Sequence, residues 1–105
     1  MKAKELLSRR EAWTRGVIAR NASGQGVPPL DPSAVSWCIV GALVKCYNLK
    51  TQDYYMALSK LDTLLANRGG QGLTKFDQSP GMYTISFNEN VVYEDVIALL
   101  NEADV

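Results

Sequence analysis

The chain has 105 residues, 47% of them hydrophobic and 21% charged, and its acidic and basic side chains balance to a formal net charge of zero. This composition is typical of a single globular domain, here spanning 1–105. The absence of histidine excludes Ser-His-Asp and Cys-His catalysis and removes the commonest metal ligand. The sequence therefore predicts no metal and no cofactor, and it argues against an enzyme.

No stretch of the sequence is typical of a membrane or secretory segment. No run approaches the roughly 18–20 apolar residues of a membrane span, and charged residues interrupt the N-terminal stretch throughout. Cys38 and Cys46 are eight residues apart on one expected helix, so they would lie about 12 Å apart along its axis, too far for a disulfide. We therefore expect a cytoplasmic protein with no membrane partner.

The first twenty residues predict a helix over 2–14 and a short strand over 17–20. The side chains that recur on one helical face are Ala3, Leu6, Leu7, Arg10 and Trp13. Arg10 is the charged exception: it either reaches water at the edge of the domain, which we slightly favour, or pairs with a carboxylate from the acidic end of the chain. Val17–Arg20 begins with β-branched residues and precedes the loop-forming run N-A-S-G-Q-G, which indicates a strand.

Residues 31–47 carry the strongest pattern in the chain and predict a buried central helix. Asp31 is a suitable N-cap, and Pro32 suits the first turn. The apolar positions at helical spacing are Val35, Cys38, Ile39, Ala42, Leu43 and Cys46, while Trp37, Val40, Val44 and Tyr47 cover much of the remaining circumference. A helix that is apolar on all sides is normally buried, so we expect this segment at the centre of the core.

Later elements complete the expected fold class. Apolar spacing predicts helices over 51–67 and 92–103, and the alternation of bulky and small residues in M-Y-T-I-S-F predicts a strand over 82–87. The Gly- and Gln-rich stretch 69–81 is expected to be a loop without the Lys-Ser/Thr pair of a phosphate-binding loop. We therefore expect an α+β fold, mostly α, with about four helices around the central helix and two short strands.

Charge is distributed unevenly along the chain. Residues 1–20 contain six basic and two acidic side chains, whereas residues 77–105 contain six acidic and no basic ones. One interpretation is that the two ends pack together so that their charges complement each other. The other is a basic patch for an anionic partner. Six basic residues diluted by two acidic ones are a weak signal for nucleic-acid binding.

Several short motifs together resemble a known group of sequences. W-T-R-G lies at 13–16, D-P at 31–32, W-C-I-V-G-A-L at 37–43, F-N-E at 87–89 and E-D-V-I-A-L-L at 94–100. In this combination the chain resembles a small family of uncharacterised bacterial and phage-borne proteins, a domain of unknown function. That family usually has Trp and Asp where this chain has Phe87 and Glu89. The resemblance implies a fold and a bacterial or phage origin, and it implies no activity.

Nine residues are candidates for a structural or a binding role. The expected structural residues are Trp13, Asp31, Trp37 and Gly41, and the expected binding residues are Arg15, Arg20, Tyr83, Asn88 and Glu89. Gly41 is interpreted as a site of close approach by another element. Asn88 either bonds the backbone between strand and helix or lies with Glu89 at the mouth of a cleft that faces Arg15 or Arg20. A carboxylate–arginine pair there would bind a small polar ligand or a peptide.

These features favour binding over catalysis, because the tyrosines and arginines are enriched at binding hot spots and no catalytic constellation is evident. The leading interpretation is a small, non-enzymatic protein-interaction module, phage- or mobile-element-associated by resemblance, that binds another protein or a second copy of itself. The alternative is a small-ligand-binding or hydrolytic protein with a cleft near Arg20, Asn88 and Glu89. Nucleic-acid binding through the N-terminal arginines is the weakest of the three.

Overall fold

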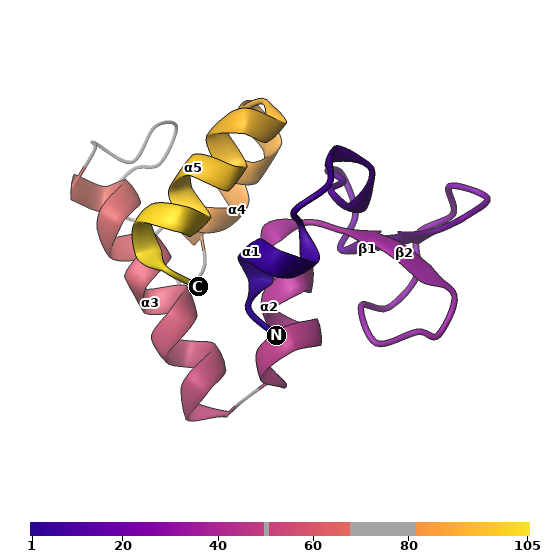
Figure 1. Ribbon diagram of the computed structural model, residues 1–105, viewed down its shortest axis with the longest axis horizontal. Coiled ribbons are helices and arrows are strands. Elements are labelled where there is room, and N and C mark those ends of the chain that lie inside the picture. The colour runs from indigo at the N-terminus through magenta and orange to yellow at the C-terminus, as the bar shows by residue number, and fades with distance from the viewer. Residues whose placement is uncertain (50, 68–81) are drawn as a thin grey trace.

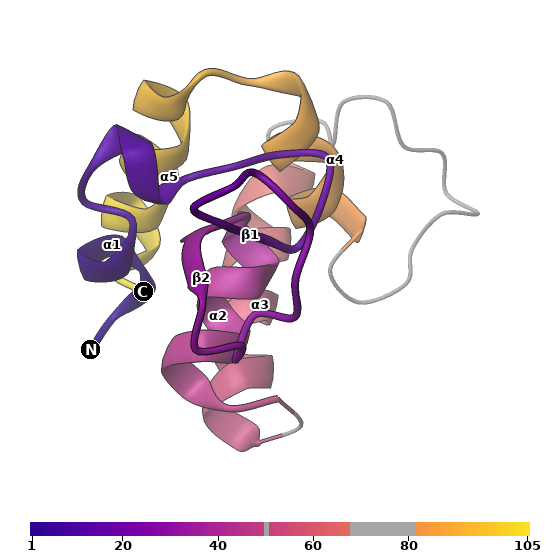
Figure 2. The same cartoon turned by 90° about the vertical axis from the view of Figure 1, so that its right-hand side faces the viewer.

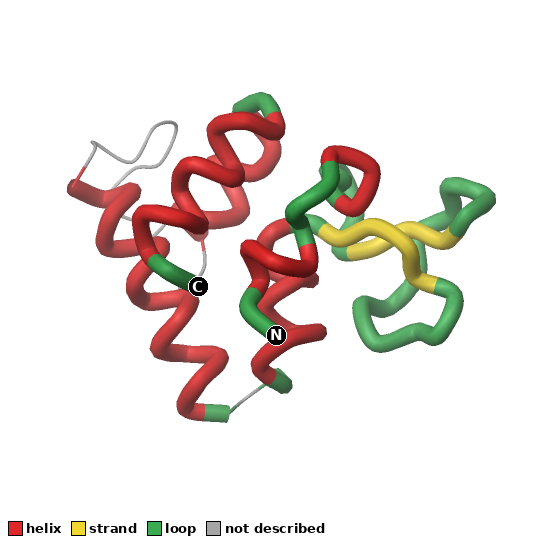
Figure 3. The backbone as a smooth tube through the Cα atoms, in the orientation of Figure 1, coloured by secondary structure: helices red, strands yellow, loops and turns green. Residues whose placement is uncertain are grey.

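The computed structural model describes residues 1–49, 51–67 and 82–105. Its elements in chain order are α1 (Ala3–Leu6), the 3-10 helix η1 (Arg10–Ala12), β1 (Ala19–Asn21), β2 (Ala34–Trp37), α2 (Ile39–Tyr47), α3 (Gln52–Asn67), α4 (Met82–Asn90) and α5 (Tyr93–Ala103). The α-helices gather on one side, and the two-stranded ribbon projects from the other (Figure 1, Figure 3). The expected α+β, mostly helical fold is confirmed.

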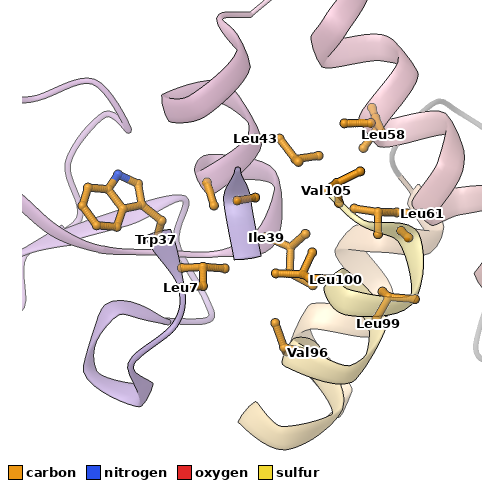
Figure 4. Packing of buried hydrophobic residues seen from close by; sticks show 14 of the residues in the cluster. Leu7, Trp37, Ile39, Leu43, Leu58, Leu61, Val96, Leu99, Leu100 and Val105 are labelled. Atoms are coloured by element: carbon orange, nitrogen blue, oxygen red, sulfur yellow. The ribbon is translucent and has the colours of Figure 1, made fainter. Parts of the chain in front are cut away.

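Helix α2 lies at the centre of the hydrophobic core. Its residues Ile39, Ala42 and Leu43 are fully buried, and α1, α3 and α4 all pack against it. Figure 4 shows Ile39 and Leu43 facing the apolar side chains of α3 and α5, among them Leu61 and Leu100. The sequence predicts that segment 31–47 is central and buried. This prediction is confirmed for the part of the segment that forms α2.

The predicted helix over 31–47 is wrong in its first half. Asp31 Oδ1 accepts hydrogen bonds from the Ser33 amide (2.8 Å) and hydroxyl (2.6 Å), and the Ala34 amide donates to the Asp31 carbonyl (3.0 Å). Asp31 therefore closes a turn that leads into strand β2, and it does not cap a helix. An Asp-Pro pair suits the start of a turn as well as the start of a helix, so the motif alone does not separate the two. Helix α2 begins one residue after Cys38, whose Sγ accepts a hydrogen bond from the Gly41 amide (3.3 Å).

The ribbon pairs β1 with β2 in antiparallel register, Ala19 opposite Trp37 and Arg20 opposite Ser36. The strand expected at 17–20 is therefore confirmed with its bounds shifted to 19–21. It pairs within the chain with β2, a segment that the sequence predicts as part of a helix.

The predicted strand over 82–87 is wrong, because this segment forms helix α4. Alternation predicts a strand on the assumption that the bulky side chains are buried. In the structure Ile85 is 45% exposed, and the buried side chains among the described ones of this helix are Thr84 and Asn88, four residues apart on one helical face. Asp62 of α3 accepts hydrogen bonds from the Thr84 amide (3.0 Å) and hydroxyl (2.7 Å), so it satisfies the first turn of α4.

The predicted helix over 2–14 is interrupted. α1 ends at Leu6, and the buried Leu7 turns its carbonyl toward α5, where the Tyr93 hydroxyl donates to it (2.6 Å). The chain then forms only the short η1 before Trp13. At the Leu7 carbonyl, the hydrogen bond from Tyr93 of α5 thus takes the place of a further hydrogen bond within the helix.

The helices predicted over 51–67 and 92–103 are confirmed as α3 and α5. Thr51 caps α3, since its Oγ1 accepts a hydrogen bond from the Tyr54 amide (3.3 Å). The predicted loop over 69–81 lies outside the described residues.

The two ends of the chain pack together, as their charges predict (Figure 2). The ammonium groups of Lys2 and Lys4 contact Asp104 Oδ1 at 2.7 and 2.5 Å. Arg10 pairs with Glu94 of α5 while it remains 61% exposed, so it both reaches water and meets a carboxylate from the acidic end.

Candidate functional site

Four of the five candidate binding residues lie around one extended segment, 13–16, which carries the W-T-R-G motif. This segment leaves η1 and runs beside β2, where the Thr14 amide donates to the Trp37 carbonyl (3.0 Å). The last turn of α4 brings Asn88 and Glu89 against it. The fifth candidate, Tyr83, belongs to the first turn of α4, at the opposite end of that helix.

Asn88 is the centre of this cluster and is only 2% exposed. Its Oδ1 accepts hydrogen bonds from Trp13 Nε1 (2.7 Å) and from the Ile39 amide (3.0 Å). Its Nδ2 donates to the Thr14 carbonyl (3.3 Å) and to Glu89 Oε2 (2.9 Å). An amide side chain offers two donors and two acceptor positions, so Asn88 has its full set of partners inside the protein.

Glu89 and Arg15 join the same segment to the end of α4 by hydrogen bonds. Glu89 Oε1 accepts a hydrogen bond from the amide of Gly16 (2.7 Å), whose φ of +86° favours glycine. Arg15 donates from Nη1 to the Glu89 carbonyl (3.3 Å) and from Nη2 to the Val91 carbonyl (2.5 Å). A cation beside the last carbonyls of a helix is favourable, because these carry partial negative charge. The Arg15 guanidinium also lies 5.0 Å from the centre of the Trp13 ring.

Arg20 joins the ribbon to the W-T-R-G segment. Its Nε donates to Thr14 Oγ1 (2.8 Å), its Nη1 to the Gly24 carbonyl (2.9 Å) and its Nη2 to the Arg15 carbonyl (3.1 Å). All three nitrogens therefore bond within the chain. Neither Arg15 nor Arg20 forms an ion pair with the Glu89 carboxylate; Arg15 donates to the Glu89 carbonyl, and Arg20 donates to the Arg15 carbonyl.

The four expected structural residues have defined positions. Trp37 is 7% exposed and donates from Nε1 to the Pro29 carbonyl (2.9 Å), while Trp13 is half-buried beside it. Hydrogen bonds from Ser33 lower the pKa of Asp31. An added Cβ at Gly41 would lie 2.2 Å from the Ile18 carbonyl oxygen. The close approach expected at Gly41 therefore involves the backbone that enters β1.

Cys38 and Cys46 are free thiols. Burial raises the pKa of each thiol above its usual range, which disfavours the nucleophilic thiolate. Among residues 1–49, 51–67 and 82–105, no group of three or more Cys, Asp or Glu side chains is arranged to hold a metal ion. The described helices also include none that is long and apolar enough to cross a membrane.

A second surface, which sequence reasoning did not select, lies on α3 and the end of α5. An open groove of about 680 Å³ runs along it, lined by Gln52, Tyr55, Met56, Ser59, Lys60, Thr63, Leu64, Glu102 and Ala103. Tyr55 and Met56 are 49% and 54% exposed there. The sequence contains only a weak signal for this surface. Tyr55 and Lys60 lie outside the buried apolar stripe of the helix, and residues in such positions usually form a solvent-exposed face.

These observations define a small α+β domain whose motif residues bond to one another. The chain belongs to DUF6197, a family of unknown function, whose model matches residues 1–104. The resemblance to an uncharacterised family is thereby confirmed. Neither a curated protein nor a solved structure matches the chain.

Proposed function

We propose that this protein is a non-enzymatic interaction module that binds a helical segment of a protein partner on the groove face, defined as the α3 residues Gln52, Tyr55, Met56, Ser59, Lys60 and Thr63. The single observation that carries this proposal is the exposed pair Tyr55 and Met56 beside the open groove. Aromatic residues and methionine are enriched in the centres of protein interfaces. Methionine also adapts its shape to different partners.

The shape of the groove supports a helix as the bound element. It follows the 16-residue helix α3, with Ala103 of α5 at its flank. An amphipathic helix laid in such a groove places apolar side chains at three- and four-residue spacing against it. The charged Lys60, at the edge of this face, then contributes to a polar rim, which is the usual arrangement of an interface.

The W-T-R-G cluster offers less to a ligand. The amide of Asn88 and the three guanidinium nitrogens of Arg20 already have partners within the chain. A small ligand there would have to replace these bonds, at a cost comparable to what it gains. We therefore place binding on α3.

We place this interaction in a bacterial cytoplasm, in a protein associated with a phage or mobile element. Two free thiols are consistent with a reducing compartment. The bacterial and phage association rests on the family resemblance.

A photo-crosslinking amino acid at position 59 tests the proposal in cells of the native host. Ser59 lines the groove, and the exposed Ser23 in the ribbon turn provides the matched control. We expect a protein adduct from position 59, a much weaker one from position 23, and loss of the adduct when Met56→Glu is added. No adduct from position 59, or equal adducts from both positions, would overturn the proposal.

A further inference from the structure

We infer that the helix accepted by the groove face is α3 of a second copy of this chain, packed antiparallel about a twofold axis. The inference rests on the proposed function and names its partner. It is carried by the placement of two charged residues, Asp53 and Lys60, relative to the exposed Met56.

The groove face forms one continuous stripe along α3. Gln52, Met56, Ser59, Lys60 and Thr63 recur at three- and four-residue spacing, which places them on one side of a helix. The buried residues of α3 occupy the opposite side, and they are Tyr54, Ala57, Leu58, Leu61 and Leu65. The stripe is therefore available to another molecule over residues 52–63, about 18 Å at 1.5 Å per residue.

Two opposite charges lie at the same edge of this stripe. Asp53 and Lys60 are both exposed, and seven residues, close to two helical turns, separate them. Neither side chain forms a hydrogen bond or ion pair with any part of the chain that the structure describes. Each is thus available to a charge on a partner.

A twofold axis makes these two charges complementary to themselves. In an isologous contact, residue i meets residue j while j meets i. With the axis midway between the two residues, at position 56–57, Asp53 lies opposite Lys60 of the partner subunit and Lys60 lies opposite the partner subunit's Asp53. The same rotation brings the charged flank of one helix beside the charged flank of the other, so both opposite-charge pairs form together.

The apolar residues support the same axis. Met56 lies at the midpoint, so the two copies of its side chain meet at the centre of the interface, where Tyr55 adds apolar area. A parallel, in-register pair of α3 helices would instead place the charged flanks of the two copies on opposite sides of the contact, where Asp53 and Lys60 meet no counterpart. The opposite-charge pairs form only in the antiparallel arrangement, so the charge pattern favours that one.

The dimer is expected to be weak. Contact through one exposed helix face is at the small end of specific interfaces, so we expect dissociation constants of about 10–100 μM. The protein then exchanges between monomer and dimer within the range that sedimentation equilibrium covers.

Sedimentation equilibrium of the purified full chain, from about 5 to about 500 μM, tests the inference with a charge swap. We expect Lys60→Asp and Asp53→Lys each to raise the dissociation constant about tenfold, since like charges then face each other. The double variant restores the opposite-charge pairs and returns the constant to within about threefold of the wild type. Lys45→Asp makes the same charge change on α2, outside the groove, and is expected to leave the constant unchanged.

A wild-type protein that stays monomeric throughout, or single and double variants that associate alike, would overturn the inference. These failures are distinct from failure of the proposed function. If the chain is monomeric and the crosslinker at Ser59 captures a different protein, the second copy is the wrong partner and the interaction role stands. If position 59 yields no adduct at all, both proposals are wrong.

Discussion

At the residue scale, Asn88 determines how the W-T-R-G segment meets the helices. Its Oδ1 serves two donors at once, the indole of Trp13 and the first amide of α2 at Ile39. The start of a helix leaves amides without intrahelical partners, so Asn88 satisfies a group of α2 from the last turn of α4. The sequence left open whether Asn88 bonds the backbone or lies with Glu89 at the mouth of a cleft; in the structure its side chain connects three segments.

Asn88→Ala is expected to destabilise the protein by about 2–4 kcal/mol, because two buried donors lose their acceptor and each costs about 1–3 kcal/mol. Thermal unfolding measures this as a fall in Tm of roughly 8 °C or more. Asn90→Ala is the matched control, since exposed Asn90 makes only one described side-chain bond, to the Ser86 carbonyl, and its substitution is expected to cost less than about 0.5 kcal/mol. Equal melting temperatures for the two variants would contradict the structural role of Asn88.

Gly41→Ala provides a second test at this scale. Alanine favours a helix over glycine by about 1 kcal/mol, yet a Cβ here would lie 2.2 Å from the Ile18 carbonyl oxygen. We expect a net loss of about 2 kcal/mol or more in denaturant unfolding. Gly26→Ala, whose Cβ would meet only the Val17 side chain at 3.3 Å, is expected to cost less. A Gly41→Ala protein more stable than the wild type would contradict the close packing.

At the element scale, the sequence predicts a helix well where its buried face is apolar. α3 and α5 follow this rule, with Leu61 and Leu99 fully buried on their inner faces. α4 does not, because the buried side chains among those described on it are Thr84 and Asn88. The Thr84 amide and hydroxyl bond to Asp62, 22 positions earlier in the chain, and no local pattern reveals such a partner.

The candidate site was predictable only in part, for a related reason. The motif indicated which residues act together, since Arg15, Asn88 and Glu89 do lie against one another. It did not indicate whether their polar atoms face solvent or bond internally, because that depends on how α4 is oriented. The groove on α3 was missed because an exposed Tyr55 or Met56 is unremarkable until its neighbours are known.

At the scale of the whole molecule, the two ends of the chain form one surface. Lys2 and Lys4 hold Asp104, and the Lys4 amide donates to the Val105 carbonyl (3.3 Å). Tyr47 of the central helix donates its hydroxyl to the same carbonyl (2.7 Å). Part of the charge asymmetry seen in the sequence is thus neutralised within the fold, because Lys2, Lys4 and Arg10 pair with carboxylates of the acidic end, which leaves less basic surface for an anionic partner.

This arrangement predicts an acid-sensitive contribution to stability. Hydrogen bonds and charge from Lys2 and Lys4 lower the pKa of Asp104 from 3.8 to about 2. Because the folded-state pKa is the lower one, the contribution is complete above about pH 4 and is lost as the pH falls toward 2. Asp104→Asn keeps a residue that tolerates the positive φ of 56° and removes the charge.

Denaturant unfolding at pH 6 and at pH 2.5, for the wild type and for Asp104→Asn, measures the effect. We expect the wild type to lose more stability than the variant between these pH values, and the difference to shrink in high salt because the ion pairs are exposed. Identical pH profiles would show that the pairs to Lys2 and Lys4 do not stabilise the folded state.

The central claim is that the W-T-R-G cluster stabilises the fold, whereas α3 binds the partner. A concentration series of amide NMR spectra of the wild-type protein tests this claim most directly. Raising the concentration through the expected range of association should shift the amide signals of residues 52–63 and leave those of residues 13–16, Asn88 and Glu89 unchanged. Shifts concentrated on 13–16, Asn88 and Glu89, with α3 unaffected, would contradict the account.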